Sequence, residues 1–477
     1  MHYIDIAIFV IYMIAMLGVG FFFLKKNKTA DDYYVGGRSM GSWHVGLSVV
    51  ATDVGGGFSI GLGGLGFTIG ISGSWMLFTG LIGAWLAAVL LIPKVSELSK
   101  TKNLLTFPQI FAHFYNPKVA LLAGVISAIG YLGFTSSQIL AGAKLASASF
   151  VGLNLNSALL IMGVIAICYT VLGGMKAVIY TDTIQWIILM SGLIFIGIPM
   201  GYYAVGGYET IKSTLAPEFL QFNNISWQTF VNWGITIIPI WFVGMTLYQR
   251  IYACKDEKTA KKAWFIAGLF EWPIMALMGV MLGLFGRVAA EQGMFASLGF
   301  GEVASMDAEL GLPLLLRSIL PVGLMGLMMS AYFSAIMSTA DSCLMAASGN
   351  LLTDVFGKWL HIGKSDNQVV RISQGLTLIV GVLALILAMY MTDVLELMLY
   401  SYAFMVSGLF VPLLAALFWK NTRPEAAFWA MLIGGGTTLV LILFKVSLPF
   451  GLDANIYGIT ASLLTFIIVN KFTKDRN

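Results

Sequence analysis

The chain has 477 residues, of which 58% are hydrophobic and 10% are charged. Soluble domains carry roughly 25% charged residues, so this composition excludes an ordinary soluble protein. The mean hydropathy of +0.87 indicates a helical protein that crosses the lipid bilayer many times. The net charge of +4 does not point to nucleic acid, because the basic residues follow membrane topology. The three cysteines and four histidines show no metal-ligand spacing.

Thirteen apolar segments have the length needed to span a membrane. They cover residues 3–24, 42–70, 73–93, 119–147, 155–172, 180–203, 227–249, 263–287, 312–347, 370–391, 395–418, 425–444 and 451–470. The ninth segment is too long for one straight span, so we expect it to contain an extension or a kink.

The basic residues predict how the chain is oriented in the membrane. If the N-terminus lies outside, nearly all of the 27 lysines and arginines fall in inner loops or in the C-terminal tail. The exceptions are Lys144, Lys212, Arg287, Arg317 and Lys445. Basic residues are enriched on the cytoplasmic side of membrane proteins. We therefore expect a multi-pass protein of the cell (inner) membrane, with its N-terminus outside and its C-terminus in the cytoplasm.

The second apolar segment contains a stretch that is a poor continuous helix. In Gly46–Ile60, Asp53 is followed by three glycines at 55–57. Glycine weakens a helix, and an acid at membrane depth is costly and usually functional. Unwound backbone at this depth is tolerated where it lines a wet cavity or is buried in protein. The pattern predicts a broken helix that holds an ion and a solute. The alternative is a packing site for two helices in which Asp53 pairs with a neighbour.

Weak internal symmetry divides the chain, which we read as a single transporter domain. With segment 3–24 set aside, residues 42–203 and 227–418 each contain five segments, and 425–470 supplies two more. Five is odd, so the two sets insert with opposite orientations. The second set also opens with an interrupted segment, in which Pro239 removes a backbone donor and Gly244 relaxes the chain. Paired interruptions of this kind predict a binding site near the bilayer midplane.

Two further stretches place polar side chains inside apolar segments. In Tyr180–Gln185, Asp182 could supply oxygens to a small cation, or Thr181 or Asp182 could cap the helix N-terminus. In Ala331–Ser348, several hydroxyl groups lie close to the small residue Ala335. Hydroxyl oxygens beside a closely approaching backbone could complete an oxygen shell around sodium, which is a hard cation. The alternative for this stretch is ordinary hydrogen bonding between helices.

The chain resembles the sodium:solute symporter family over nearly its whole length. The resemblance rests on DDYYVGGRSMG (31–41), YTVLGGMKAVIYTDTIQ (169–185) and AIMSTADS (335–342). It implies an all-α, leucine-transporter-like fold of two inverted repeats of five helices, with one extra helix in front and two behind. It also implies a symporter that imports a small organic solute with sodium (Na+) by alternating access.

The resemblance assigns site residues as well. The main sodium site would use backbone carbonyls of Ala51, Val54 and Ala335, and the hydroxyls of Ser338 and Thr339. Some members of the family have a second sodium site, which would here correspond to Asp182, Ser338, Ser342 and Asp341. The solute is expected near the two breaks, in contact with Asp53, Gly55, Gly56, Phe134, Gln138, Trp241, Ser401 and Tyr402.

The acid at Asp53 matches a position that is acidic in the proline transporters, where it could face the amine of a zwitterion. We therefore expect an amino acid or a related, proline-like zwitterion. Alternatives are a monocarboxylate or pantothenate-like acid, and choline, although the choline branch has tryptophans where this chain has Asp53 and Gly244. Protons could replace sodium, with Asp53 or Asp182 as the carrier. A monomer could suffice for this activity.

Two other classes of membrane protein fit the sequence less well. An intramembrane enzyme would need a nucleophile–base pair or a metal cluster at depth, and the scattered histidines do not supply one. A channel would usually show a repeated pore segment or a ring of like residues, which the sequence lacks. We therefore expect a transporter and not an enzyme.

Overall fold

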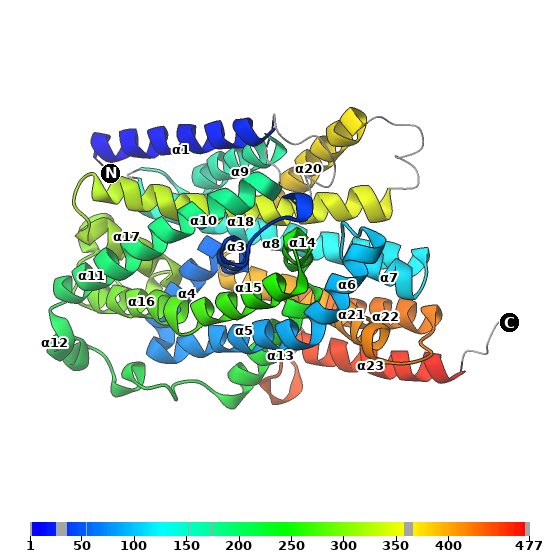
Figure 1. Ribbon diagram of the computed structural model, residues 1–477. Coiled ribbons are helices and arrows are strands. Elements are labelled where there is room, and N and C mark those ends of the chain that lie inside the picture. The colour runs from blue at the N-terminus through cyan, green and yellow to red at the C-terminus, as the bar shows by residue number, and fades with distance from the viewer. Residues whose placement is uncertain are drawn as a thin grey trace.

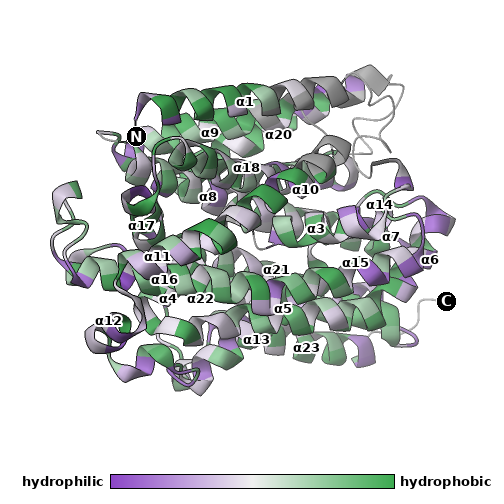
Figure 2. Ribbon diagram, turned by 60° about the vertical axis from the view of Figure 1, so that its left-hand side comes forward, coloured by the Kyte–Doolittle hydropathy of each residue, from purple (hydrophilic) through white to green (hydrophobic). Residues whose placement is uncertain are grey.

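The computed structural model describes residues 2–24, 36–53, 55–150, 152–172, 175–356 and 366–472. Within these ranges the fold is helical, and strand pairing is limited to an isolated bridge between Met40 and Cys254. The long helices lie side by side along one direction (Figure 1). Hydrophobic residues cover the middle of the bundle, and hydrophilic residues gather towards its two ends (Figure 2). This is the distribution expected for a bundle surrounded by lipid.

The principal helices follow the predicted apolar segments. They are α1 Tyr3–Leu24, α3 Ser42–Asp53, α4 Gly55–Ile69, α5 Trp75–Leu86, α6 Ile92–Lys102, α7 Pro108–Phe114, α8 Pro117–Ser149, α9 Leu155–Leu172, α10 Met175–Gly192, α11 Ile198–Ala204, α12 Gly207–Thr214, α13 Trp227–Val243, α14 Met245–Ala253, α15 Glu257–Leu269, α16 Ala276–Glu291, α17 Gly311–Ile319, α18 Leu324–Asn350, α20 Asp366–Ala388, α21 Val394–Phe418, α22 Pro424–Leu443 and α23 Ala454–Phe472. Each of the thirteen predicted segments overlaps one or more of these helices.

The number of spans remains a prediction. In the described part of the chain, eight helices are long and apolar enough to cross a membrane, and nine if a bent pair counts as one. One of the eight, Ser59–Lys102, has 44 residues, about twice the length that spans a bilayer. Within it, Gly70 adopts φ +68° and separates α4 from α5. The polar helix α18 is not among the eight.

Among the helix interruptions in the described residues, two lie where the sequence predicts them and a third was not predicted. The helix α3 ends at Asp53 and α4 begins at Gly55, whose φ is +41°. The pair α13 and α14 bends by 43° at Gly244, while Pro239 lies inside α13. The third interruption joins α15 to α16 through η6, Phe270–Met275, in which Trp272 leaves the helical conformation.

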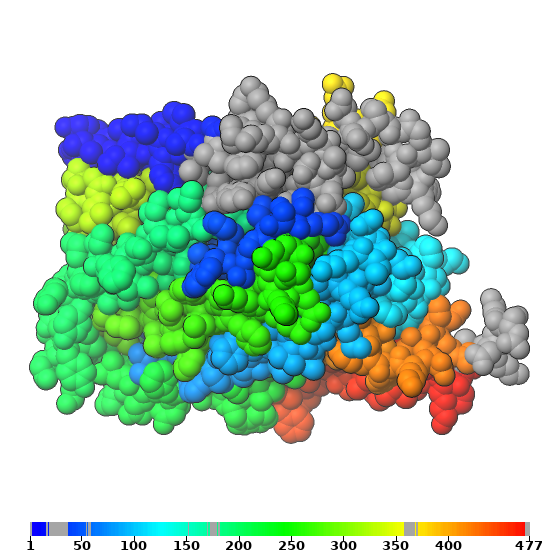
Figure 3. All heavy atoms as spheres, viewed as in Figure 1, coloured from blue at the N-terminus to red at the C-terminus, as the bar shows by residue number. Residues whose placement is uncertain are grey.

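The long ninth segment consists of two helices. The short α17 ends at Ile319, and α18 begins at Leu324 after Gly323, which has φ +88°. The Asp5 carboxylate of α1 accepts the backbone N–H groups of Gly323 (2.6 Å) and Gly326 (2.9 Å). An acid at this position satisfies free N–H groups and the positive end of the helix dipole. The helix α1 lies directly against α18, as the space-filling view also shows (Figure 3).

The helices α4 and α16 cross through backbone contact. A Cβ atom on Gly66 would lie 2.1 Å from the Val280 carbonyl oxygen, and one on Gly283 would lie 2.0 Å from the Gly63 carbonyl oxygen. Real Cβ atoms do not approach this closely, so α4 and α16 fit together because these positions lack side chains. Small residues at helix crossings allow this close packing in membranes.

The substitution Gly283→Ala should therefore destabilise the protein. A methyl group against backbone atoms forces the helices apart, at a cost towards the upper end of about 1–3 kcal/mol. Alanine gains about 1 kcal/mol of helix propensity over glycine, which offsets part of this cost. The matched control is Gly436→Ala in α22, where an added Cβ meets nothing within 4 Å. Thermal unfolding in detergent should show a lower melting temperature for Gly283→Ala, and an unchanged or higher one for the control. Equal melting temperatures would contradict the packing.

Candidate transport site

The α3–α4 break lies against α18, and the Thr339 hydroxyl of α18 links the two elements. The Thr339 hydroxyl donates to the carbonyl oxygens of Ala51 (3.2 Å) and Ala335 (3.1 Å). The Ser338 hydroxyl lies 3.3 Å from the same Ala335 oxygen. A Cβ on Gly55 would lie 2.4 Å from the Thr339 Oγ1 atom, so glycine is needed for this close approach. All five residues are buried.

The chemistry of this cluster suits a hard cation. Ala51 lies in the last turn of α3, where carbonyl groups have no N–H partner further along the helix. The C-terminal end of a helix also carries partial negative charge. The cluster consists of carbonyl and hydroxyl oxygens, the ligand type that hard cations prefer. Of the five residues predicted for the main sodium site, Val54 lies outside the described residues, and the structure brings the other four together.

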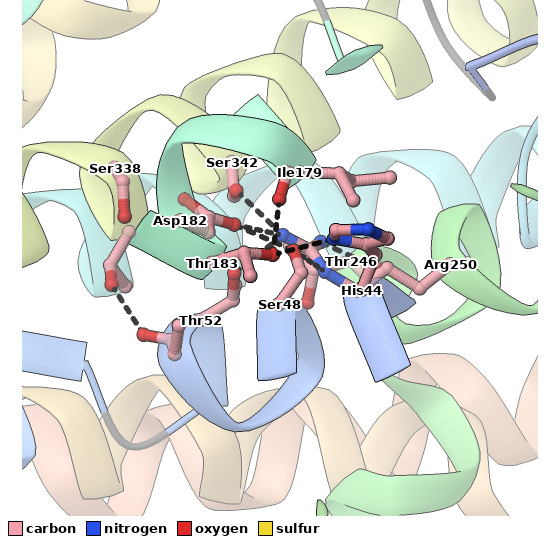
Figure 4. A network of polar contacts seen from close by, with 12 residues as sticks. His44, Ser48, Thr52, Ile179, Asp182, Thr183, Thr246, Arg250, Ser338 and Ser342 are labelled. Carbon is pink, nitrogen blue, oxygen red and sulfur yellow. Dashed lines mark hydrogen bonds and ion pairs between the residues drawn. The ribbon is translucent and has the colours of Figure 1, made fainter. Parts of the chain in front are cut away.

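A second polar cluster surrounds the buried Arg250 of α14 (Figure 4). Its guanidinium group forms an ion pair with Asp182 of α10, at 3.3 Å between Nη2 and Oδ2. The same Nη2 atom contacts the hydroxyls of Ser342 (3.1 Å) and Thr52, and Nε donates to Ser48 (3.0 Å). Ser48 donates to Asp182 in turn, at 2.6 Å. One cation thereby connects α3, α10, α14 and α18.

The residues predicted for a second sodium site bind different partners in this arrangement. The Arg250 guanidinium lies between Asp182 and Ser342, and already neutralises the acid. Asp182 keeps one oxygen, Oδ1, without a hydrogen-bond donor among the described residues. Asp341 interacts with a different element, because the Thr170 hydroxyl of α9 donates to it. Arg250 was predicted to lie in an inner loop, and the structure places it in α14 instead. The signal in the sequence was the run TLYQRIYA, which indicates that the helix continues past Gly244.

Several residues predicted to bind the solute come together beside the break. Tyr402 of α21 donates to Asp53 Oδ1 (3.4 Å), and the Tyr402 ring meets the Phe134 ring of α8 edge to face, with centroids 5.0 Å apart. Ser401 faces α8, where a Cβ on Gly133 would lie 2.3 Å from its hydroxyl oxygen. These residues place α3, α8 and α21 around one acid.

The remaining predicted solute residues lie in different surroundings. Gln138 is buried one turn after Phe134 on α8, and its Nε2 atom lies 3.3 Å from the Ser137 hydroxyl. Gly56 is the second residue of α4. Trp241 is fully buried against α5 and α15: a Cβ on Gly83 would lie 2.4 Å from its ring, and the Trp264 ring lies 6.4 Å away.

Glu271 has no role predicted from the sequence, yet the structure places it beside the site. Glu271 lies in η6, is fully buried, and its carboxyl group is within hydrogen-bonding reach of Asp53. A Cβ on Gly80 of α5 would lie 1.9 Å from Glu271 Oε2, one turn along α5 from the contact with Trp241. The signal in the sequence was an acid two residues before Pro273 inside a long apolar segment.

A cavity of about 1280 Å³ lies near this region. It is lined by α4, α21, residues 304–309 and residues 445–454, and it reaches Ala403, the neighbour of Tyr402. Among its lining residues, Asp307 and Glu309 are paired with the buried Lys144. The other charged lining residues are Asp393, Glu396, Lys445 and Asp453. The excess of acids should concentrate cations in this cavity.

Comparisons with known proteins identify the fold and the family. A model of the sodium:solute symporter family matches residues 33–434. The chain belongs to this family. The symporter is 28% identical to the osmoregulated proline transporter of Bacillus subtilis, over 97% of this chain and 94% of the relative. It is 28% identical to the sodium/proline symporter of Escherichia coli, over 91% and 86%. It is 26% identical to the sodium/glucose cotransporter of Vibrio parahaemolyticus, over 99% and 90%.

Solved structures agree with the expected fold. A sodium-coupled sialic acid symporter in a substrate-bound outward-open state matches with a TM-score of 0.80 and 22% identity, covering 99% of this chain and 98% of that chain. Mhp1, a nucleobase-cation-symport-1 family transporter, matches with a TM-score of 0.58 and 13% identity, covering 93% and 95%. The leucine-transporter-like fold is therefore confirmed. The protein is a multi-pass membrane transporter that couples solute movement to sodium.

The Arg250 cluster generates a stability prediction. The substitution Arg250→Ala leaves Asp182 buried without its counter-charge, which costs about 3–5 kcal/mol. The control is Lys261→Ala, which removes the more exposed ion pair with Glu257 and should cost less than about 1 kcal/mol. Melting temperatures in sodium-free detergent buffer should fall strongly for Arg250→Ala and little for Lys261→Ala. Combining Arg250→Met with Asp182→Leu should recover much of the loss. Equal effects of the two single substitutions would show that the pair is not structural.

Proposed function

We propose that this symporter imports a small zwitterion, such as an amino acid of the proline type, together with sodium across the cell (inner) membrane. The observation that carries the proposal is the position of Asp53 at the α3–α4 break, beside the oxygen cluster formed with α18. An acid next to a sodium-type site can bind the amine of a solute. Two of the relatives described above are proline transporters, which agrees with this solute class.

The proposed main sodium site consists of the carbonyls of Ala51, Val54 and Ala335 and the hydroxyls of Ser338 and Thr339. Its support is that the Thr339 hydroxyl bonds the Ala51 carbonyl oxygen across from α18 to α3, while the Ser338 and Thr339 hydroxyls lie 3.3 and 3.1 Å from the Ala335 carbonyl oxygen. A bound sodium would fix the end of α3 to α18, and so stabilise the conformation in which the break is organised for the solute. Solute and sodium should then each tighten the binding of the other by the same factor.

The proposed solute site extends from this break. The residues are Asp53, Gly55, Gly56, Phe134, Gln138, Trp241, Ser401 and Tyr402. The amine of the zwitterion would face Asp53, and its carboxylate would face the N–H groups at the start of α4, which begins at Gly55. The N-terminus of a helix attracts anions in this way, and broken helices in transporters use it for substrate carboxylates.

A second sodium at Asp182, with Ser342 and Asp341, has less support. Arg250 already supplies a positive charge between Asp182 and Ser342, and Asp341 is bound by Thr170. We therefore propose that one sodium accompanies each solute. The proposed orientation places the N-terminus outside and the C-terminus in the cytoplasm, and the proposed working unit is a monomer. Both proposed ligand sites draw on residues of one chain, which is why a monomer could suffice.

The sodium site can be tested with the double substitution Ser338→Ala and Thr339→Ala. Each hydroxyl contributes on the order of 1 kcal/mol or more to a bound cation, so the half-saturating sodium concentration for uptake should rise at least about tenfold. Ser330→Ala is the control, because its hydroxyl lies on the same helix and bonds the Gly326 carbonyl. Uptake with an unchanged half-saturating sodium concentration in the double variant would refute the assignment.

The coupling can be tested in reconstituted vesicles loaded with potassium. Radiolabelled proline should accumulate above its external concentration when sodium is present outside, because the inward sodium gradient drives it. Replacing external sodium with potassium at constant pH should abolish this accumulation. A proton-coupled protein would keep accumulating in a pH gradient without sodium, and a protein that merely binds proline would show no accumulation under either condition.

A further inference from the structure

Glu271 occupies an unusual position for a charged residue. It lies near the middle of the apolar helical run Glu257–Glu291, where the helix is interrupted at Trp272, and none of its surface is exposed. Burying a carboxylate costs much free energy unless it is paired or hydrogen-bonded. A buried acid at membrane depth is therefore retained for a reason beyond packing.

The surroundings of Glu271 provide space but no donor. Among the described residues, neither of its carboxylate oxygens has a hydrogen-bond donor. Gly80 makes room for it, since any side chain at that position would collide with Oε2. Its carboxyl group is directed at Asp53, the acid at the α3–α4 break. Two buried acids thus lie next to each other beside the proposed solute position.

The charges around this pair do not balance it. Arg250 acts on Asp53 from a distance, but its guanidinium N–H groups are directed to Asp182 and to surrounding hydroxyl and carbonyl groups. Tyr402 donates one neutral hydroxyl to Asp53. Two neighbouring carboxyl groups repel each other when both are ionised, so such a pair is stabilised either by sharing one proton or by a cation that places N–H donors between them.

We propose that Asp53 and Glu271 together form a clamp for the ammonium group of the solute, each accepting at least one N–H. This inference rests on the function proposed above and narrows its substrate class. The solute is a primary or secondary amine, which offers two or more N–H donors. A quaternary ammonium compound has the charge but no donors, and a simple carboxylate has neither. Glu271 then determines specificity for such amines, because the clamp needs a second carboxyl group beside Asp53 to accept another N–H.

If the clamp is correct, the affinity for amines of equal charge should increase with the number of N–H donors that each amine offers. Proline, N-methylproline and N,N-dimethylproline share a ring and a carboxylate and offer two, one and no N–H donors. Glycine and its mono-, di- and trimethylated forms offer three, two, one and none. Each compound should be added to the purified full-length protein in saturating sodium, and affinity read from the rise in melting temperature, which follows mass action.

In the native protein, affinity should fall at least about tenfold between proline and its dimethylated form, because a charge-assisted hydrogen bond contributes about 1.5–3 kcal/mol. Glu271→Gln keeps the shape but removes one acceptor charge. This substitution should lower the affinity for proline at least about tenfold. It should also reduce the ratio of the affinities for proline and N-methylproline to less than about threefold. Stabilisation by sodium alone should be unchanged, which shows that the variant folds. Glu425→Gln, at an exposed position of α22, should behave like the native protein.

The possible outcomes distinguish a failure of the clamp proposal from a failure of the proposed sodium symport. A quaternary ammonium compound or a monocarboxylate that stabilises the protein best, and only with sodium, would overturn the clamp and leave symport intact. An unchanged ranking in Glu271→Gln, or no stabilisation by any amine of the two series, would also overturn it. Amines that bind equally with and without sodium, but lose affinity in Glu271→Gln, would support the clamp and count against the proposed sodium coupling.

Discussion

Lipid offers no hydrogen bonds, and this constraint governs the centre of the protein. Each polar group at depth must find its partner inside the bundle. The carbonyls released at the end of α3 meet the hydroxyls of α18, and the Asp5 carboxylate covers the first N–H groups of α18. The interrupted helices are stable because other helices complete their bonding. The same exposed oxygens are available to an ion, so the solution to a folding problem also creates a binding site.

The buried Arg250 solves a related problem. Four helices direct hydroxyl, carbonyl or carboxylate oxygens towards one guanidinium group. Arginine suits this position because its planar group offers five donors in fixed directions. The cluster holds a guanidinium group, paired with Asp182, whose contact Ser342 lies one turn along α18 from Ser338 of the proposed sodium site. A fixed cation already contacts both Asp182 and Ser342, and this supports the proposal of a single sodium.

The sequence predicts the helical content, the positions of the principal helices and the two paired interruptions, because these follow from local composition. Apolar length indicates burial in lipid, and the glycines after Asp53 indicate a helix that cannot continue.

The partners of buried polar side chains are harder to predict from the sequence. The pairing of Arg250 with Asp182 joins residues 68 apart in sequence, and nothing local distinguishes Arg250 from an inner-loop arginine. Glu271 was visible as an acid in an apolar run, but its direction towards Asp53 depends on the interruption at Trp272 and on the space left by Gly80. The break before α18 was expected as a kink, and its position at Gly323 depends on Asp5 of a distant helix.

The crossing of α4 with α16 has a mechanical consequence. Where Gly66 meets Val280 and Gly283 meets Gly63, backbone touches backbone with no side chains between them to rearrange. Such a joint resists sliding, because a shift along either helix would bring larger residues into a gap that fits none. The helices α4 and α16 should then move together as one rigid body during transport. The bending that lets a pathway open on alternate sides must be absorbed elsewhere, and Gly55, next to the end of α3, is placed to act as the hinge.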